Sequence, residues 1–388
     1  MTGMTSSARD LRRGAIPARR LFVSTARIAR YPLGPWAAEL RRQIAAAMAS
    51  PTRPDEPAWC REIIRCGNNA ALVQLHAGRS DAAMEICLAQ IHWLRTLASR
   101  YRKPHLLTLT LQPWINIGRL YAKQGRVDDA LRHFAEIRAC TTDGPSNVGD
   151  WVIEPHQWAR SGWTAKGLRQ FGRSVWVTDS LRTLFGAGRY DAVLSMASSD
   201  TAVELASFAY MLQEAEVVAL ACLGRLTKAL DRTRRYEIRA PAWERLILQL
   251  RRAECLFACG EHEIARSVVG RLIAVCRQIS INSKAKLAFL LPIQHLLRLA
   301  ILLDPVPAWP ELAEDLYAAA LRLDDEVLRV EALQLTVAGG VAGAERIQEL
   351  NHLLETTAYA QLRNGAGPSA ESSEIDLLFG DMMAALSA

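Results

Sequence analysis

The sequence has no run of 18 consecutive apolar residues, and this lack excludes a helix that spans a membrane. No two cysteines form a C-x-x-C pair, which argues against a zinc site or a dithiol redox motif. Segments in which polar and apolar residues alternate are hard to find, so a sheet-based fold is not expected. Lysine is scarce, with six residues against 41 arginines, and nothing in the spacing of the arginines pairs them for one ligand.

The motifs of the common enzyme classes are missing as well. We find no nucleophile elbow, phosphate-binding loop, dinucleotide-binding fingerprint or set of metal ligands. The sequence therefore predicts neither a metal nor a cofactor, and it identifies no catalytic residue. An enzyme is the less favoured interpretation.

The eight cysteines fit free, buried thiols in a reducing compartment, because most of them lie inside apolar helical patterns. Cys255 and Cys259 are four residues apart and would share a helix face, but no histidine or third cysteine lies at the spacing of zinc ligands. The full set is Cys60, Cys66, Cys87, Cys140, Cys222, Cys255, Cys259 and Cys276.

Most of the net positive charge of the chain lies in its first 30 residues. The net charge is +7, and residues 1–30 hold seven arginines and the single acid Asp10, which gives +6 there and leaves about +1 for the rest. The arm is either a solvated terminus or a segment that binds phosphate or an acidic surface without sequence specificity. Its apolar stretches are broken by arginine and proline, unlike a secretory signal, so we expect a cytoplasmic protein; an organellar transit peptide is the alternative.

One segment carries a repeat motif in a chain dominated by the helix formers alanine, leucine and arginine. Residues 111–140 follow the pattern W-x2-L-G-x2-Y with a later Ala and, four residues on, Phe, and the matching residues are Trp114, Gly118, Tyr121, Ala130 and Phe134. Ile117 replaces the leucine. This segment resembles one complete tetratricopeptide repeat, in which Gly118 permits close helix packing and Gly125 ends the first helix with a positive φ.

Glycines with similar small and apolar neighbours recur along the chain. The steps between them are 47, 63, 36 and 36 residues, and the glycines are Gly78, Gly125, Gly188, Gly224 and Gly260. Each is expected where a helix pair folds back. The predicted fold is therefore all-α: a right-handed superhelical α-solenoid of tetratricopeptide-like helix–turn–helix repeats. Degenerate helix pairs are expected at the end, the first at 284–303 and 309–323 and the second at 325–338 and 342–360, around Gly339 and Gly340.

The predicted organisation follows from these repeats and the segments between them. In chain order it comprises a basic arm plus one helix (1–48), a linker (49–58), repeats (59–140), a Trp-rich insert (141–173), further repeats with degenerate C-terminal pairs (174–362), a flexible linker (363–374) and an amphipathic tail helix (375–388).

Four of the ten tryptophans fall in or next to the insert. The insert either packs on the array as local core or forms a ligand or partner site, since insertions in repeat proteins often lie on the binding face. His156 with Glu154 also suggests acid–base chemistry, although two residues do not make an active site. The candidate residues are Trp151, Glu154, His156, Trp158, Arg160, Trp163 and Trp176.

The predicted tail helix has an apolar face. A short helix of this kind is not stable alone, so it must pack on another surface. The members of the apolar face are Ile375, Leu378, Phe379, Met382 and Leu386. The favoured interpretation is that the helix caps the last repeat; the alternatives are that it fills the chain's own groove or binds a partner.

The family resemblance implies that the first helix of each repeat lines a concave groove. This lining would be polar, of mixed sign and basic in its N-terminal half. Its residues are Arg65, Asn68, Asn69, Asn116, Arg119, Lys123, Asp179, Arg182, Glu214, Arg251 and Glu254. We expect such charges to be solvated or to bind a ligand, since they are not expected to help the array pack. The Asn–Arg–Lys set resembles the way some tetratricopeptide domains clamp a peptide carboxylate, without the Lys-rich version of that clamp.

Three functions are compatible with these features. The favoured hypothesis is an adaptor or partner subunit that binds a protein or peptide segment in the groove. The alternative is an enzyme, or the substrate-binding subunit of one, in a bacterial specialised-metabolite pathway, with a small-molecule site formed by the insert and the groove. The third is a peptide-responsive regulator, which is weakened because residues 1–48 contain no DNA-reading helix-turn-helix signature. Neither a specific nucleic acid nor a membrane is expected as a partner.

Overall fold

The computed structural model describes residues 33–50, 56–141, 146–148, 151–153, 164–198, 209–278, 287–306, 308–322, 326–356 and 369–387. The chain divides into two compact units. Among the described residues, unit 1 comprises those from 184 to 356, and unit 2 comprises those from 33 to 183 together with 369–387. Each unit has its own apolar core.

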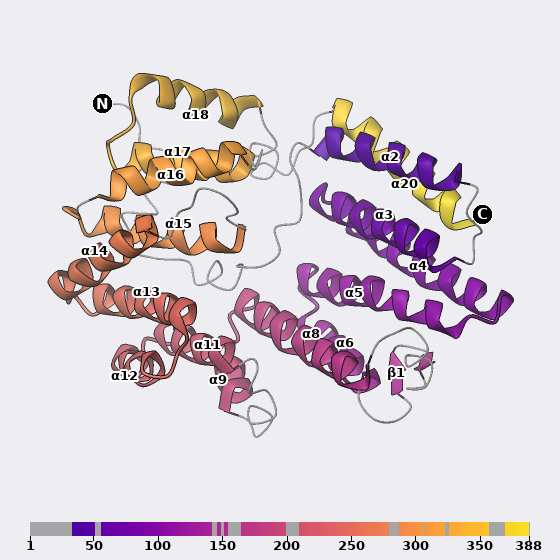
Figure 1. Cartoon of the computed structure of the whole chain (residues 1–388), viewed down its shortest axis with the longest axis horizontal. Helices are drawn as coiled ribbons and strands as arrows, with labels where there is room; N and C mark the ends of the chain where they lie inside the picture. Colours follow the sequence, from indigo (N-terminus) through magenta and orange to yellow (C-terminus); the bar gives the residue numbers. More distant parts are fainter. Residues whose placement is uncertain are drawn as a thin grey trace. The chain divides into compact units, whose positions relative to one another are not determined.

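Unit 2 is almost entirely helical (Figure 1). Its two short strands pair antiparallel, with Val148 opposite Trp151. Its elements are α2 (Leu33–Met48), α3 (Pro57–His76), α4 (Ser80–Arg100), the 3-10 helix η2 (Pro104–Thr110), α5 (Leu111–Lys123), α6 (Val127–Cys140), β1 (Ser146–Val148), β2 (Trp151–Ile153), most of α8 (Ala165–Gly186) and α20 (Ser369–Ser387).

Unit 1 consists of helices throughout its described part, and the all-α prediction is confirmed. Its elements are α9 (Tyr190–Ser198), α11 (Ala209–Cys222), α12 (Leu226–Glu237), α13 (Ala242–Ala258), α14 (His262–Gln278), α15 (Leu287–Leu302), α16 (Trp309–Arg322), α17 (Glu326–Ala338) and α18 (Ala344–Thr356). None of the described helices is both long and apolar enough to cross a membrane.

The recurring glycines form the turns between paired helices. All five have a positive φ, between 69° and 83°, and Gly340 joins them with a φ of 73°. At the turn after α5, the backbone N–H of Arg126 donates to the carbonyl of Tyr121 at 2.9 Å, which is the hydrogen bond of a Schellman helix end. The same bond recurs at the other five turns, from Arg79 to Gln74, Arg189 to Leu184, Arg225 to Leu220, Glu261 to Leu256 and Val341 to Thr336.

Paired helices pack on one another, and the first helices of successive pairs are also in contact. In unit 1 the pairs are α11 with α12, α13 with α14, and α17 with α18, and the first helices α11, α13, α15 and α17 contact one another in that order. In unit 2, α3 pairs with α4 and α5 with α6, and α3 contacts α5. Side chains on the first helices of neighbouring pairs can therefore meet.

The α5–α6 pair shows why the motif residues are needed. Phe134 and Ala130 on α6 are fully buried against α5. His133 lies beside them, where its Nε2 donates to the carbonyl of Trp114 at 2.8 Å. Burial lowers the pKa of His133, opposed by the hydrogen bond to Trp114. A neutral imidazole thus belongs to the packing of this pair.

Substituting Gly118 by alanine should destabilise the chain, because the new Cβ would lie 2.4 Å from Phe134 Cε1 and 3.0 Å from His133. We expect a loss of about 1–3 kcal/mol in the free energy of unfolding, measured by urea denaturation. Gly270→Ala in α14 is the matched control, since no atom lies within 4 Å of its added Cβ. That change should be neutral or stabilise by roughly 0.5–1 kcal/mol. Equal effects would mean that close packing does not decide the Gly118 position.

Several predicted boundaries need correction. The linker at 49–58 ends earlier, because Pro57 is the first residue of α3, where its missing N–H costs nothing. Helix α8 begins at Ala165, inside the predicted insert, and β1 and β2 form a hairpin that was not expected. The tail helix begins at Ser369, so part of the predicted flexible linker is helical. The arm at 1–32 lies outside the described residues.

The tail helix α20 packs on the helices at the start of the chain, not on the last pair (Figure 1). Leu378 and Met382 are fully buried in the core of unit 2, among residues of α2, α3 and α4, and Phe379 is partly buried. Arg41 on α2 donates to Asp381 at 2.7 Å and to Glu374 at 3.0 Å, and Arg79 pairs with Asp376. The expectation that α20 caps the last repeat is therefore wrong: its apolar face matches the open face of α2, α3 and α4.

Candidate functional site

In unit 2, polar side chains on the first helices α3, α5 and α8 form a connected row. Asn116 Nδ2 donates to Asn68 Oδ1 at 3.1 Å, and Gln112 Nε2 donates to Asn116 Oδ1 at 3.2 Å. One turn further along α5, Arg119 reaches Asp179 on α8. The structure thus brings together residues that lie 48 and 60 positions apart in the sequence. We call Asn68, Asn116, Arg119, Lys123, Asp179 and Arg182 the unit 2 row.

Asp179 is the anchor of the unit 2 row. Its side chain is only 4% exposed and accepts two hydrogen bonds from Arg119, at 2.9 and 3.0 Å. Arg182 lies 3.4 Å from the same carboxylate. Burial lowers the pKa of Arg182, and the neighbouring Arg119 cation lowers it further, while Asp179 raises it. Two guanidinium groups therefore lie beside one carboxylate.

The other residues predicted for the groove of unit 2 are more exposed. Arg65 is exposed and bonds to Glu62 and to Gln43 of α2, so it belongs to an ion pair on the surface of α3. Asn69 is half-buried and Lys123 is exposed at the end of α5. Arg119, Arg182 and Lys123 against Asp179 give the row a net charge of +2.

In unit 1, the predicted groove residues form a buried charge cluster. Arg251 on α13 is 4% exposed, and it donates to Glu214 of α11 at 2.9 Å and to Glu254 at 2.9 Å. Glu214 and Glu254 are 13% and 11% exposed. His295 of α15 lies 3.9 Å from Glu254. We call Glu214, Arg251, Glu254 and His295 the unit 1 cluster.

Burial and pairing act against each other in this cluster. Burial raises the pKa of Glu254, and the Arg251 cation opposes that rise. Burial alone would lower the pKa of Arg251, but the attraction of Glu254 and Glu214 outweighs it, and the pKa is raised. Arg251 is thus held in its charged form between the two carboxylates.

These contacts correct one part of the sequence interpretation. Charged residues on the first helices were not expected to help packing. The pairs Arg251–Glu214 and Arg119–Asp179 instead join the first helices of neighbouring pairs. Gln294 of α15, which was not among the predicted residues, donates to Glu331 of α17 at 2.7 Å in the same arrangement. Glu331 lies nine residues before Gly340, as Arg251 lies nine before Gly260, so alignment on the turn glycine could have found it.

Most of the Trp-rich insert lies outside the described residues. This holds for Glu154, His156, Trp158, Arg160 and Trp163. For Trp151, which is in β2, only the backbone is described. Trp176 is on α8, where the guanidinium of Arg138 stacks over its ring at 4.2 Å. Trp176 packs against α6, so one of the four candidate tryptophans belongs to the local core.

Burial makes several of the thiols poor nucleophiles. Burial raises the pKa of Cys66 and Cys276 to about 11 and that of Cys87, Cys140 and Cys255 to about 12. Such thiols are protonated near neutral pH and react slowly. No group of three or more His, Cys, Asp or Glu side chains in the described residues is arranged to hold a metal ion.

A thiol-reactive reagent should label Cys259 first. Cys259 is the exposed cysteine, while Cys222 and Cys276 are half-buried and the other five are buried. Cys259 is the C-cap residue of α13, one turn beyond the buried Cys255. In the native protein we expect one fast equivalent with a chromogenic disulfide, and the remaining thiols should react on unfolding. Cys259→Ser should remove the fast phase, and its persistence would contradict this assignment.

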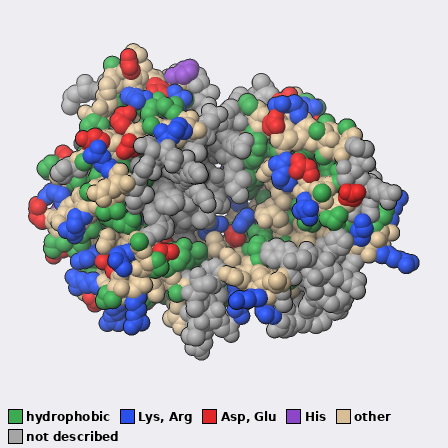
Figure 2. Space-filling model, in the orientation of Figure 1, with side chains coloured by type: hydrophobic (Ala, Val, Ile, Leu, Met, Phe, Trp, Pro, Cys, Tyr) green, Lys and Arg blue, Asp and Glu red, His purple; other side chains and the backbone are tan. Residues whose placement is uncertain are grey.

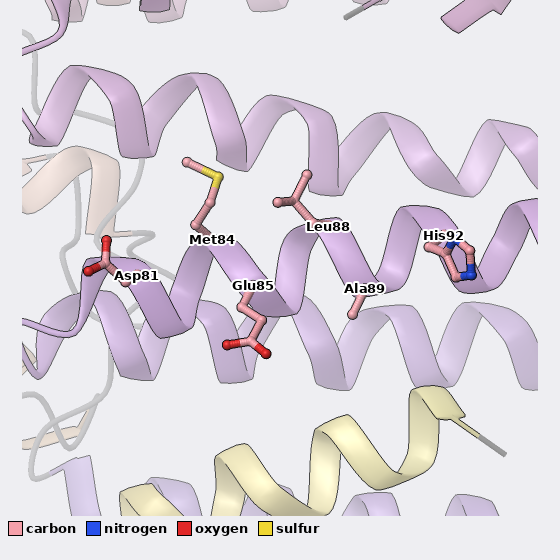
Figure 3. A pocket seen from close by; sticks show the side chains of 6 residues that line it. All are labelled: Asp81, Met84, Glu85, Leu88, Ala89 and His92. Carbon is pink, nitrogen blue, oxygen red and sulfur yellow. The ribbon is translucent and has the colours of Figure 1, made fainter. Parts of the chain in front are cut away.

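A pocket lies along α4 in unit 2 (Figure 3). It is a shallow, open hollow of about 480 Å³ whose lining residues share one stripe of the helix. They are Asp81, Met84, Glu85, Leu88, Ala89 and His92. This lining has no nucleophile–base pair, so the hollow suits a contact surface better than a reaction site.

Comparison with known proteins assigns no family. Neither the scan against models of known protein families nor the search of curated proteins finds a match for this chain.

Proposed function

We propose that this chain is a tetratricopeptide-like binding protein, and that the unit 2 row holds an acidic segment of a partner polypeptide. The repeat assignment is supported by the Schellman turns at the recurring glycines and by the Trp, Gly, Tyr, Ala and Phe of α5 and α6. A right-handed superhelical course of the helix pairs is part of the same proposal.

The Arg119–Asp179–Arg182 triad carries the proposal. Two guanidinium groups lie at one carboxylate, and the exposed Lys123 adds a further positive charge two turns from Asn116. A ligand carboxylate that accepts hydrogen bonds from guanidinium would form a strong, charge-assisted pair there. The Nδ2 group of Asn68 donates to none of the described residues, so it can donate to a peptide carbonyl.

The neighbouring contacts keep this row in place before a ligand arrives. Arg119 is fixed by two hydrogen bonds to the buried Asp179, and Asn116 is held between Gln112 and Asn68. Side chains that are already ordered lose less entropy on binding. The row is therefore suited to binding, and it lacks a group placed for acid–base chemistry.

The burial of Asp179 limits which substitutions can test this proposal. Replacing Arg119 would leave the buried Asp179 without its main partner, and a loss of binding could then reflect misfolding. Lys123→Glu and Arg182→Gln are better choices, because Arg119 still pairs with Asp179 in both. Arg132→Glu is the matched control, since Arg132 is an exposed arginine on α6, away from the row.

Binding is measured by fluorescence anisotropy with two labelled peptide pools. One pool carries glutamate and aspartate at fixed positions, and the other carries glutamine and asparagine at the same positions. We expect the acidic pool to bind, Lys123→Glu and Arg182→Gln each to weaken it about tenfold, and Arg132→Glu to leave it unchanged. Equal binding of both pools, or unchanged affinity in both variants, would exclude the row as the site.

A further inference from the structure

The outer face of α12 and the turn that follows it, in unit 1, carry a group of exposed cations. Lys228, Arg234, Arg235 and Arg239 are exposed, while Ala229 and Thr233 on the opposite side of the helix are buried. Figure 2 shows a group of lysine and arginine side chains at the place of α12. Lys228, Arg235 and Arg239 form no ion pair with any described residue, and the one acid on this face, Asp231, lies 3.9 Å from Arg234.

An exposed apolar side chain lies among these cations. Ile238 is 78% exposed, the highest value for any large apolar side chain in the described residues. It follows Arg235 by three positions and precedes Arg239. We call Lys228, Arg235, Ile238 and Arg239 the basic face.

The outer face of α4 in unit 2 has the opposite composition. Leu88 is 51% exposed, second only to Ile238 among the described large apolar side chains. Glu85 and Asp81 precede it by three and seven positions, so all three share one stripe (Figure 3). Neither acid forms an ion pair with a described residue, and the stripe borders the shallow hollow. We call Asp81, Glu85 and Leu88 the acidic face.

We propose that the chain associates with a second copy of itself, with the basic face of one copy packed on the acidic face of the other. The two most exposed large apolar side chains would cover each other, and charges of opposite sign would surround them. An anionic membrane or a nucleic acid fits the basic face but not the acidic one, whereas a second copy satisfies both. The interface joins two different surfaces, so it is heterologous.

The contact is expected to be weak and salt-dependent. One helix face on another buries less than the roughly 1,200 Å² of a stable standard interface, so a dissociation constant of about 10–100 µM is expected. Exposed ion pairs are screened by salt, so raising the ionic strength should weaken the association several-fold. This proposal does not depend on the unit 2 row, and either can fail without the other.

Sedimentation velocity of the full chain, over concentrations that bracket this range, tests the proposal. The wild type should shift from monomer to larger species as its concentration rises. Two charge-reversal variants, D81K/E85K on the acidic face and K228E/R235E/R239E on the basic face, should each remain monomeric. All five residues are exposed, so both variants should keep the wild-type helical circular dichroism.

Mixing the two variants provides the decisive measurement. The first retains an intact basic face and the second an intact acidic face, and the two reversed faces are also complementary, so a mixture should associate in equal proportions. A contact between these faces within one chain would not be restored by mixing. Leu88→Ser and Ile238→Ser should each weaken wild-type association about fivefold or more without changing a charge. R132E should not change it. A monomeric wild type, or a mixture that stays monomeric, would overturn the proposal.

Discussion

Replacing Leu378 by alanine should destabilise unit 2 by about 2–5 kcal/mol. Leu378 is fully buried, and Ile375, Met382 and Leu386 on the same face of α20 are buried with it. Removing its side chain leaves a cavity between α20 and the helices α2, α3 and α4.

The adjacent residue supplies the control. Leu377 is 45% exposed on the other side of α20, so Leu377→Ala should change the free energy of unfolding by less than about 0.5 kcal/mol. Hydrogen exchange identifies which helices respond. In Leu378→Ala, faster exchange is expected in α2, α3 and α4, and unchanged exchange in α17 and α18. Faster exchange confined to α17 and α18 would instead restore the idea that the tail caps the last pair.

Replacing Arg251 by methionine should cost about 3–5 kcal/mol at neutral pH. Methionine keeps much of the side-chain volume, but it leaves Glu214 and Glu254 buried without their common cation. Arg245→Met on the same helix is the control, because Arg245 is exposed and bonds only a backbone carbonyl. That variant should lose at most about 1 kcal/mol, as measured by urea unfolding.

The cost of Arg251→Met should depend on pH. Burial already raises the pKa of Glu254 above its value in the unfolded chain, and losing the Arg251 cation should raise it further. A carboxyl group with a raised pKa favours folding while it is protonated, and this contribution is lost as the pH rises through the folded-state pKa. The substitution should therefore cost most near pH 7 and less below about pH 5.

Two outcomes would contradict this account of the unit 1 cluster. One is a cost that does not change with pH. The second concerns the triple variant Glu214→Gln, Glu254→Gln and Arg251→Met. This variant should recover much of the lost stability, because it removes the unpaired charges, and no recovery would contradict the account.

The dual role of the first-helix charges limits what substitutions in this chain can reveal. Arg119 and Arg251 each bind a carboxylate on a neighbouring first helix, so replacing them alters the packing of helix pairs as well as any ligand site. Lys123 has no such partner role and can be changed with less structural cost. Experiments on function should therefore begin with Lys123 and Arg182, and experiments on stability with Arg251.

Much of the local structure was predictable from the sequence alone. Five glycines end helices with a positive φ, a conformation in which other residues are strained, so the residue type itself predicts these turns. They are Gly78, Gly125, Gly188, Gly224 and Gly260. The small and aromatic residues of α5 and α6 predict close packing in the same way. The apolar stripe of α20 was also visible, since a 3.6-residue period depends only on neighbours in the sequence.

The tertiary structure decided which distant surfaces meet. The amphipathic stripe of α20 predicts that this helix packs on another surface, but it does not identify that surface. Only the fold shows that α20 forms hydrogen bonds with Arg41, Gln74 and Arg79. Likewise, a charge on a first helix looks the same in sequence whether it is solvated or paired. Arg119 and Asp179 become partners because α5 and α8 lie side by side, across 60 residues of chain. Turns and helix faces are set by local sterics and periodicity, whereas pairings across the chain depend on how complete surfaces fit together.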